Sequence, residues 1–411
     1  MRFIKSQANT TPLIDAVFKV TKQAKDAIAK HGNAAVTNAT IGVLLDENQQ
    51  LVAFNSVFDN YNKLNNRQKA AYATGILGND NFRKQTFHWV TEGINLDLHH
   101  SAVATSGGAG ALATTISNML DPNEILILPE IGWGPYTLMA SDNNLQYRTY
   151  KMFENDAFNI NSFKQVCLEV LATQKKLLVV INDPCHNPTG YSLTKEEWQE
   201  IIDFMNECSK EAPCIILNDI AYIDFGYNSD ETRKYMETFN TISDNVVIIS
   251  AFSISKSLTS YGLRCGAALI LAKNPQTVRD IEVVFEKCAR ARWSNVNNSA
   301  MENFVQVTTQ HREALEKEKA QYVALLKQRS DIFLSEAKAC GLICYPYKEG
   351  FFVTIAVEDD QLLETYYQAL QDNLIFTIKV QKGIRVAVCS LNIEKCKGLA
   401  QRMKNILDAL K

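Results

Sequence analysis

Four apolar runs of this 411-residue chain are each followed by residues that could take part in chemistry. In chain order these residues are 106–112 (SGGAGAL), 184–190 (PCHNPTG), Asp219 with Tyr222, and 253–256 (SISK) with Arg264. The first segment precedes a helical pattern, so its backbone N–H groups would lie at the positive end of a helix, where phosphate binds. Taken alone, it is equally typical of a tight turn without a ligand, and its spacing is not GxGxxG.

Lys256 and Asp219 give the combination its chemical meaning. A lysine at the end of a buried strand must lose its charge or gain a partner, and an imine with an aldehyde cofactor removes that charge. A carboxylate such as Asp219 could keep a pyridine nitrogen protonated, so that the ring withdraws electrons from a carbanion. In isolation, Lys256 could instead extend to solvent and Asp219 could cap a helix. Together, the four segments predict one cofactor site.

The bulk composition is typical of a globular enzyme with a small-molecule partner. Hydrophobic residues make up 46% of the chain and charged residues 21%, and a chain of this length usually exceeds one core, so we expect two domains. The net charge of −3 offers no basic field to nucleic acid or to an anionic membrane. Without a secretory signal or an apolar run of about 18–20 residues, we expect a cytoplasmic protein.

The ten cysteines are scattered along the chain. They form no CxxC pair, and no histidine lies at the spacing of a zinc ligand. We therefore expect reduced, mostly buried thiols and no metal site.

Short apolar runs between about 98 and 272 indicate a sheet. The runs are HSAVATS, EILILPE, KLLVVIND, APCIILND, NVVIISAF and CGAALILA. They are apolar on both faces and alternate with helical stretches such as 161–174 and 194–209, a pattern typical of a mainly parallel sheet covered on both sides. Ligands of such sheets bind beyond the carboxyl ends of the strands, where the chemical residues above are found.

The rest of the chain predicts a smaller α+β domain. A helical pattern over 13–31 ends at Gly32, and a long charged amphipathic stretch covers 299–339. The elements that follow are FFVTIAV, a helix over 359–372, IFTIKV, IRVAVCS and a helix over 393–410. We expect an N-terminal arm and part of the small domain in 1–47, a large domain in 48–298, and a connecting helix with the small C-terminal domain in 299–411.

Eight segments, in chain order, resemble the class I aminotransferases of PLP fold type I, and among them the aspartate and aromatic amino acid branch. These segments are NATIGVLLDE (38–47), GGAGAL (107–112), GWGPY (132–136), CHNPTG (185–190), NDIAY (218–222), SISK with Arg264, ARARWSN (289–295) and IRVAV (384–388). The resemblance implies an α/β fold in which a seven-stranded, mainly parallel sheet lies between helices. It also implies a smaller α+β domain and pyridoxal 5′-phosphate as cofactor.

The resemblance implies a role for each residue of the cofactor site. Lys256 would hold the cofactor as a Schiff base and later move the proton, and Asp219 would bind the pyridinium nitrogen. Asn187 and Tyr222 would bond to the 3′ oxygen, and Trp133 would stack on the ring. The phosphate would be held by a further group of residues: Gly107, Gly108, Ala109, Ser253, Ser255 and Arg264.

The same resemblance implies a substrate site. Arg385 would grip the α-carboxylate of the substrate through two hydrogen bonds. Ile41 and Gly42 would line the approach, and Trp133 and Asn187 would also border the substrate.

Two further matches imply a homodimer with shared active sites. Tyr72 resembles a tyrosine that this family contributes across the dimer interface, although the local spacing differs by one residue and core packing is an alternative. Arg290 occupies the place from which this branch sends an arginine into the neighbouring subunit's site to bind a side-chain carboxylate. Arg292 could take that role instead, and either arginine could be a solvated surface residue.

The chain departs from the family pattern at several positions. Ala109 lacks the threonine hydroxyl of aspartate-specific members, and Tyr136 replaces a histidine usually found three residues after the stacking tryptophan, although His186 remains. Asn297 interrupts the usual SNPP, and Leu263 replaces an acid. These departures bear on substrate choice more than on the reaction.

We therefore expect an aminotransferase that moves an amino group between an L-amino acid and a 2-oxo acid, by a ping-pong route through pyridoxamine phosphate. Aspartate and glutamate are the favoured substrates, and aromatic amino acids are the alternative. A PLP-dependent lyase or decarboxylase could use the same fold. A PLP-sensing transcription regulator would need a basic helix-turn-helix module, for which the ~37 residues before NATIGV are too few.

Overall fold

The computed structural model describes residues 3–4, 10–13 and 15–410. Its largest sheet has seven strands. Their spatial order is β2 (His99–Thr105), β10 (Gly266–Ala272), β9 (Val246–Ser253), β8 (Cys214–Asp219), β7 (Leu177–Asn182), β3 (Ile125–Pro129) and β4 (Gln146–Tyr150). Strand β10 runs antiparallel to both of its neighbours, and the other pairs are parallel. The predicted mainly parallel sheet is therefore confirmed.

Apolar side chains fill both faces of this sheet. Along β7, Val179 faces one hydrophobic core and Leu178 and Val180 face another, because successive side chains of a strand point to opposite faces. One core is completed by helices α5 (Gly107–Met119), α6 (Pro135–Asp142) and α11 (Pro275–Arg292). The other is completed by α4 (Asp80–Val90), α7 (Ile160–Leu171), α8 (Lys195–Cys208) and α12 (Asn298–Thr309). This two-sided burial explains the continuous apolar runs of the sequence.

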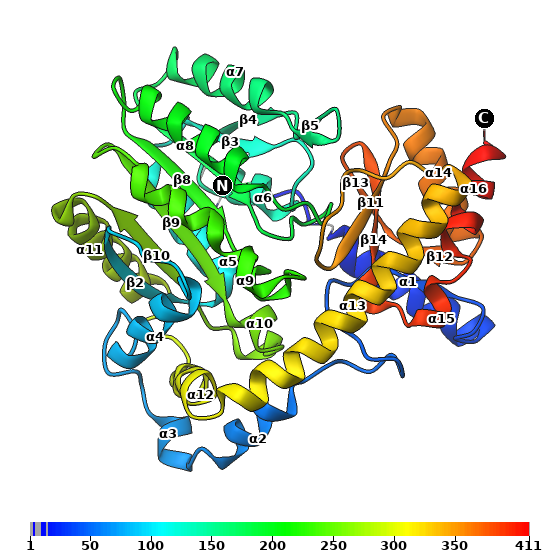
Figure 1. Ribbon diagram of the computed structural model, residues 1–411, viewed down its shortest axis with the longest axis horizontal. Helices are drawn as coiled ribbons and strands as arrows, with labels where there is room; N and C mark the ends of the chain where they lie inside the picture. Colours follow the sequence, from blue (N-terminus) through cyan, green and yellow to red (C-terminus); the bar gives the residue numbers. More distant parts are fainter. Residues whose placement is uncertain (1–2, 5–9, 14, 411) are drawn as a thin grey trace.

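A smaller antiparallel sheet stands beside the large one (Figure 1). It has the order β11 (Phe352–Ala356), β14 (Gly383–Ala387) and β13 (Ile378–Val380). Its neighbours along the chain are the helices α14 (Asp360–Asp372), α15 (Ile393–Cys396) and α16 (Leu399–Asp408). From the other end of the chain, β1 (Thr37–Asn38) pairs with β12 (Ile375–Phe376), and α1 (Ala16–His31) contacts β12. The domain limits expected at 47/48 and 298/299 stay a prediction.

Two expected helices are each divided in the structure. The stretch 299–339 forms α12 and then α13 (Arg312–Cys340). Helix α13 runs from α12 to the small sheet (Figure 1). At the end of α12 the hydroxyls of Thr308 and Thr309 donate to carbonyls one turn back, a bonding that slightly destabilises a helix. The stretch 393–410 divides at Gly398, whose φ of 70° suits glycine.

The remaining elements are short. They are α2 (Asn55–Lys63), α3 (Asn66–Ala70), β5 (Phe153–Glu154), β6 (Ala157–Phe158), η1 (Ile223–Phe225), α9 (Ser229–Thr232), η2 (Lys234–Thr241), α10 (Ile254–Ser257), η3 (Tyr261–Leu263) and η4 (Val388–Ser390).

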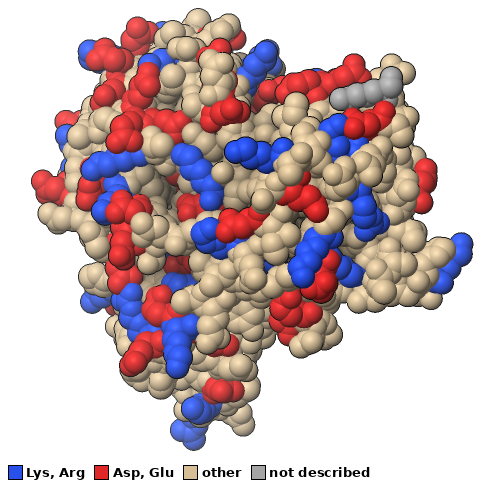
Figure 2. Space-filling view, turned by 45° about the vertical axis from the view of Figure 1, so that its right-hand side comes forward, with Lys and Arg blue, Asp and Glu red and all other residues tan. Residues whose placement is uncertain are grey.

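Surface charge is mixed, and all ten cysteines are free thiols. Figure 2 shows Lys and Arg side chains interspersed with Asp and Glu over the visible face.

Within the described ranges, none of the helices combines the length and apolar character needed to cross a membrane. The same residues include no group of three or more His, Cys, Asp or Glu placed to hold a metal ion.

Candidate active site

Lys256 lies on α10, directly after the carboxyl end of β9. Its Nζ donates a hydrogen bond to the backbone carbonyl of Gly42. Three aromatic rings surround this amine, with centroids 4.8 Å away for Tyr261, 5.4 Å for Tyr222 and 5.5 Å for Phe351. The amine is therefore held in a largely apolar setting while the residue keeps part of its surface exposed.

This setting changes the acidity of the lysine. Burial and, to a smaller extent, the positive charges of Arg385 and Arg264 lower the pKa of Lys256 from its ordinary 10.5 to about 8. A larger fraction of the amine is unprotonated near neutral pH than in a solvent-exposed lysine. Because the free amine is the nucleophilic form, the site favours attack on a carbonyl carbon.

Asp219 ends the neighbouring strand β8 and is buried. Its Oδ2 accepts a hydrogen bond of 2.6 Å from the hydroxyl of Tyr136, and its Oδ1 accepts one of 3.1 Å from the backbone N–H of Ala221. Burial raises the pKa of Asp219 from 3.8 to about 6, although both hydrogen bonds act in the opposite direction. A protonated ring nitrogen placed against this carboxylate would supply the missing positive charge.

Arg385, on β14, faces the same site from the small sheet. Its Nη1 donates to Asn187 Oδ1 at 3.2 Å and its Nη2 donates to the carbonyl of Thr40 at 2.8 Å. The guanidinium carbon lies 4.4 Å from the ring centroid of Phe352. The buried Nε has no hydrogen-bond partner. An arginine with an unused donor and a buried planar face fits a carboxylate ligand.

The position of Asn187 is fixed by a hydrogen bond of its backbone N–H. Its N–H donates to Asn182 Oδ1 at 2.7 Å, and the side-chain amide of Asn182 donates to the carbonyl of Asp219 at 2.8 Å. Asn182 thus connects the loop of Asn187 to the end of β8. This connection fixes the position of the Asn187 amide relative to the Asp219 carboxylate.

The N-terminus of α5 forms a cradle that suits an anion. Gly107 has a φ of 75°, and a Cβ added there would lie 2.5 Å from Arg264 Nη2. A Cβ added to Gly108 would lie 3.0 Å from the Cβ of Ser253. The side chain of Ser106 does not cap the helix, so the first-turn N–H groups, including that of Ala109, are left to a ligand.

Arg264 completes this cradle from the other side. Its φ is 47°, and its Nη1 donates to Ser255 Oγ at 2.9 Å and to the carbonyl of Tyr261 at 2.9 Å. Small residues, serine hydroxyls and one guanidinium therefore meet where β2, β9 and the Lys256 segment end. This donor set fits the phosphate of the cofactor that the sequence resemblance implies.

Trp133 and Tyr136 lie at the start of α6. Their rings meet edge to face, with centroids 5.4 Å apart and an interplanar angle of 85°.

His186 directly precedes Asn187. Its Nδ1 shares a hydrogen bond of 2.8 Å with the hydroxyl of Thr189, and its buried Nε2 has no partner. Burial lowers the pKa of His186 to about 3, so this ring is neutral at ordinary pH.

Three predicted site residues lie on the surface of the chain. Tyr72 is 84% exposed. Arg290 and Arg292 are also exposed, and Arg290 donates to Ser294 Oγ at 2.6 Å. Their predicted role in a neighbouring subunit's site stays a prediction.

Several residues of the site were not predicted from the sequence. Asn182 ends an apolar run and Thr40 lies within NATIGV, so both had a local signal. Tyr261 and Phe352 had none, because their contacts with Lys256 and Arg385 depend on the approach of distant segments. The thiol of Cys389 is also buried here, 3.8 Å from the carbonyl of Ile41, and burial raises its pKa to about 12.

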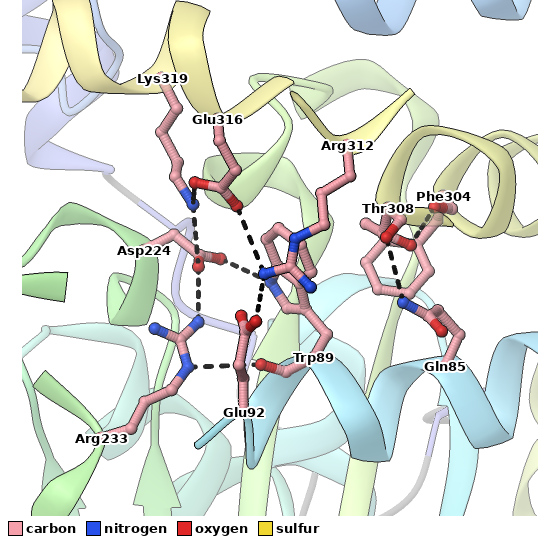
Figure 3. Close-up of polar contacts among 10 residues, drawn as sticks. All are labelled: Gln85, Trp89, Glu92, Asp224, Arg233, Phe304, Thr308, Arg312, Glu316 and Lys319. Carbon is pink, nitrogen blue, oxygen red and sulfur yellow. Dashed lines mark hydrogen bonds and ion pairs between the residues drawn. The ribbon is translucent and has the colours of Figure 1, made fainter. Parts of the chain in front are cut away.

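A charge cluster surrounds Asp224, two residues after Tyr222 in the sequence (Figure 3). At its centre Asp224 accepts from Trp89 Nε1 at 3.0 Å, pairs with Arg233 at 2.7 Å, and lies 3.7 Å from Lys319 Nζ. Burial raises the pKa of Asp224, but the charges of Lys319 and Arg233 outweigh it and hold that pKa well below its ordinary value. The outer members of this charge cluster are Glu92, Arg312 and Glu316.

The charge cluster joins segments that are far apart in the sequence. Asp224 belongs to η1, Trp89 to α4 and Lys319 to α13. Arg312 adds an ion pair to Glu92, and its guanidinium lies 5.4 Å from the ring of Trp89. We conclude that the charge cluster fixes the loop after β8 against the long helix.

Comparison with known proteins agrees with this geometry. Residues 34–403 match the model of the family described as aminotransferase class I and II. A mitochondrial aspartate aminotransferase of Schizosaccharomyces pombe is 26% identical over 71% of this chain and 66% of its own length. An aromatic-amino-acid aminotransferase of Paracoccus denitrificans is 26% identical over 49% of this chain and 50% of its own length. The chain thus matches about half to two thirds of these relatives.

Solved structures extend the likeness over the whole fold. An aminotransferase from Anaerococcus prevotii is 33% identical, with a TM-score of 0.95 over 98% of this chain and 99% of that chain. An aromatic-amino-acid aminotransferase from Burkholderia pseudomallei, covalently bound to pyridoxal phosphate, has a TM-score of 0.79 at 18% identity over 99% of this chain and 100% of that chain. The second likeness supports the fold alone. With the family match covering most of its length, the chain belongs to the class I and II aminotransferases.

Proposed function

We propose that this chain is a pyridoxal-phosphate-dependent aminotransferase that moves an amino group between an L-amino acid and a 2-oxo acid. The observation that carries the proposal is the convergence of three groups around Tyr222. The Lys256 amine lies 5.4 Å from its ring, and Asp219 precedes Tyr222 by three residues. Arg385 donates to Asn187 Oδ1, and Asn182 bonds both to the N–H of Asn187 and to the carbonyl of Asp219. This arrangement supports one site for an amine, an acid and a guanidinium.

Different residues of the site would bind different parts of the cofactor. When bound, the cofactor supplies a ring that accepts electrons from the substrate Cα. Asp219 would hold a proton on the ring nitrogen, and Trp133 would cover one ring face. The N–H groups of Gly107 and Gly108 and the guanidinium of Arg264 would hold the phosphate. Asn187 and Tyr222 would orient the ring through its oxygen.

The catalytic steps follow from where these residues stand. Arg385 would bind the α-carboxylate of the amino acid and so fix the orientation of Cα. The amine of Lys256, unprotonated in a sizeable fraction because its pKa is lowered to about 8, would remove the proton from Cα and later deliver it to the C4′ carbon of the cofactor. Product release and the reverse sequence with a second 2-oxo acid would give ping-pong kinetics.

Lys256 gives the first test of this proposal. Lys256→Ala should remove the Schiff-base absorbance of the cofactor-loaded protein and stop transamination. Lys210→Ala is a matched control, because the Lys210 side chain is 69% exposed and pairs only with Glu207. A Lys256→Ala protein that transaminates at the wild-type rate would refute the proposal.

For the substrate we favour aspartate and glutamate, with aromatic amino acids as the alternative. The support is Arg290, whose exposed guanidinium could reach the site of a second chain in a homodimer, as could Tyr72. Curated relatives of both substrate types match the chain. The proposed homodimer can be checked by light scattering of the purified protein.

The substrate proposal is tested by kcat/KM for aspartate and phenylalanine. Arg290→Ala should lower the value for aspartate by roughly 30-fold, because a charge pair is lost, and should change that for phenylalanine much less. Arg292→Ala is measured in parallel, because a loss for aspartate in that variant instead would assign the role to Arg292, the other exposed guanidinium of this segment. An unchanged value for aspartate in Arg290→Ala excludes the assigned role. Release of CO₂, or of pyruvate together with ammonia, would point to a decarboxylase or a lyase.

A further inference from the structure

Tyr136 contacts two parts of the proposed cofactor site with one side chain. It lies in the first turn of α6 and is 1% exposed. Its hydroxyl donates to Asp219 Oδ2 at 2.6 Å, and its ring meets Trp133 edge to face. The residue therefore links the acid that would face the ring nitrogen to the indole that would cover the ring.

The Tyr136 hydroxyl is one of the few groups next to Asp219 that can affect its ionisation. The residues opposite Asp219 on β7 and β9 are Asn182 and Ala251, and neither titrates. Tyr222, on the loop of Asp219 itself, is a phenol whose pKa burial raises. Burial raises the pKa of Asp219, and the hydrogen bonds from the Tyr136 hydroxyl and the Ala221 N–H lower it. Of these two donors, only the hydroxyl belongs to a side chain.

Tyr136 is suited to one direction of hydrogen bonding. Burial, and then the charge of Asp219, raise the pKa of Tyr136 well above 10, so it is a neutral donor at every working pH. A hydrogen bond to the charged form of an acid favours that form. A histidine at this position could gain or lose a proton in the working range, whereas this phenol does neither.

From this geometry we infer that Tyr136 is a positioning residue, which holds Asp219 ionised and Trp133 in place so that both can bind a protonated pyridine ring. The inference rests on the proposed function. It assigns to α6 a part in setting cofactor affinity, in addition to the residues that would touch the cofactor.

The test measures binding of pyridoxamine 5′-phosphate to apoprotein between pH 5 and 8. This probe has no carbonyl group, so its affinity does not depend on a covalent bond to Lys256. Tyr136→Phe should weaken binding about tenfold at neutral pH, the effect of losing a hydrogen bond to a charged group. Affinity that depends on ionised Asp219 is lost as pH falls through its pKa. That loss should begin at a higher pH in the variant.

Tyr150→Phe serves as the matched control. Tyr150 is also fully buried, and its hydroxyl donates to the carbonyl of Val180 at 3.3 Å on the edge of the same sheet. This variant should bind the probe like wild type at every pH. Tyr136→His, which restores a donor, should recover most of the affinity lost in Tyr136→Phe.

The outcomes separate the inference from the proposed function. If the wild-type apoprotein does not bind the probe, the proposed function fails. If wild type binds and Tyr136→Phe has the same affinity and pH profile, the inference is overturned. It is also overturned if Tyr136→Phe and Tyr136→His bind equally weakly with unshifted profiles, because Tyr136 would then act only through packing.

Discussion

Two buried carboxylates, Asp219 and Asp224, lie five residues apart in the sequence and are treated in opposite ways by the fold. Each is 5% exposed. Asp224 has Arg233 and Lys319 beside it, and these charges hold its pKa well below the ordinary value. Asp219 has only a phenol and a backbone N–H, and burial raises its pKa to about 6.

The difference indicates that Asp224 stabilises the fold, whereas Asp219 serves the proposed cofactor site. A buried charge is costly unless it is paired, and the chain pairs Asp224 with its own cations. Among the residues that the structure describes, no such cation pairs with Asp219, so a cationic ligand group would relieve the cost of ionising that acid. An undercompensated acid at the end of one strand, with a lysine of lowered pKa after the end of the neighbouring strand, is typical of a functional site.

The largest effect is expected for Asp224→Asn. The variant leaves Arg233 and Lys319 buried without their common anion. The free energy of unfolding should fall by about 3–5 kcal/mol, measured by urea denaturation. The same measurement on Asp219→Asn should give a stability equal to or above that of wild type. Equal losses in both variants would remove the contrast.

Asp219→Asn should instead impair catalysis. An amide cannot hold a proton on the ring nitrogen as a carboxylate does, so kcat/KM should fall by roughly a hundredfold to a thousandfold. Steady-state assays at matched fractions of folded protein would measure it. Comparable activity in Asp219→Asn and wild type would contradict the role given to this acid.

The pH dependence of stability should separate the two acids without cofactor. The pKa of Asp219 is raised on folding from 3.8 to about 6, so the folded state binds the extra proton and stability falls as pH rises through this window. Asp219→Asn should remove a loss of at most about 3 kcal/mol. Asp224 has a lowered pKa, so its stabilisation is present above pH 3.8 and is lost on acidification. Urea denaturation at several pH values gives both difference curves.

The smallest effect is expected at the rim of the charge cluster. Arg312 pairs with Glu92, but their side chains are 40% and 43% exposed. Arg312→Gln should therefore change the free energy of unfolding by less than about 1 kcal/mol. A loss as large as that of Asp224→Asn would mean that the charge cluster acts as one unit.

Much of the fold was predictable because its signals are local. Runs that are apolar on both faces predict buried strands, and six of the seven strands of the large sheet follow from them. The seventh, β4, has three exposed residues at the sheet edge and no such run. The reversal of β10 depends on how the sheet pairs, which apolar pattern does not encode.

The site was predictable in part for the same reason. Lys256, Asp219 and Asn187 follow strand ends, and the resemblance placed Arg385. The bond between Tyr136 and Asp219 joins residues 83 positions apart, and no local pattern predicts it. The charge cluster is likewise assembled from four separate segments, so its members read in the sequence as ordinary surface charges.

The central claim is that Lys256 bonds to the carbonyl carbon of pyridoxal phosphate. The most direct measurement is reduction of the cofactor-loaded protein with borohydride, which fixes the carbon–nitrogen bond, followed by proteolysis and mass spectrometry. The account predicts one modified residue, Lys256, and loss of the modification when an amino acid substrate is added first. A modified lysine elsewhere in the chain, or none, would contradict it.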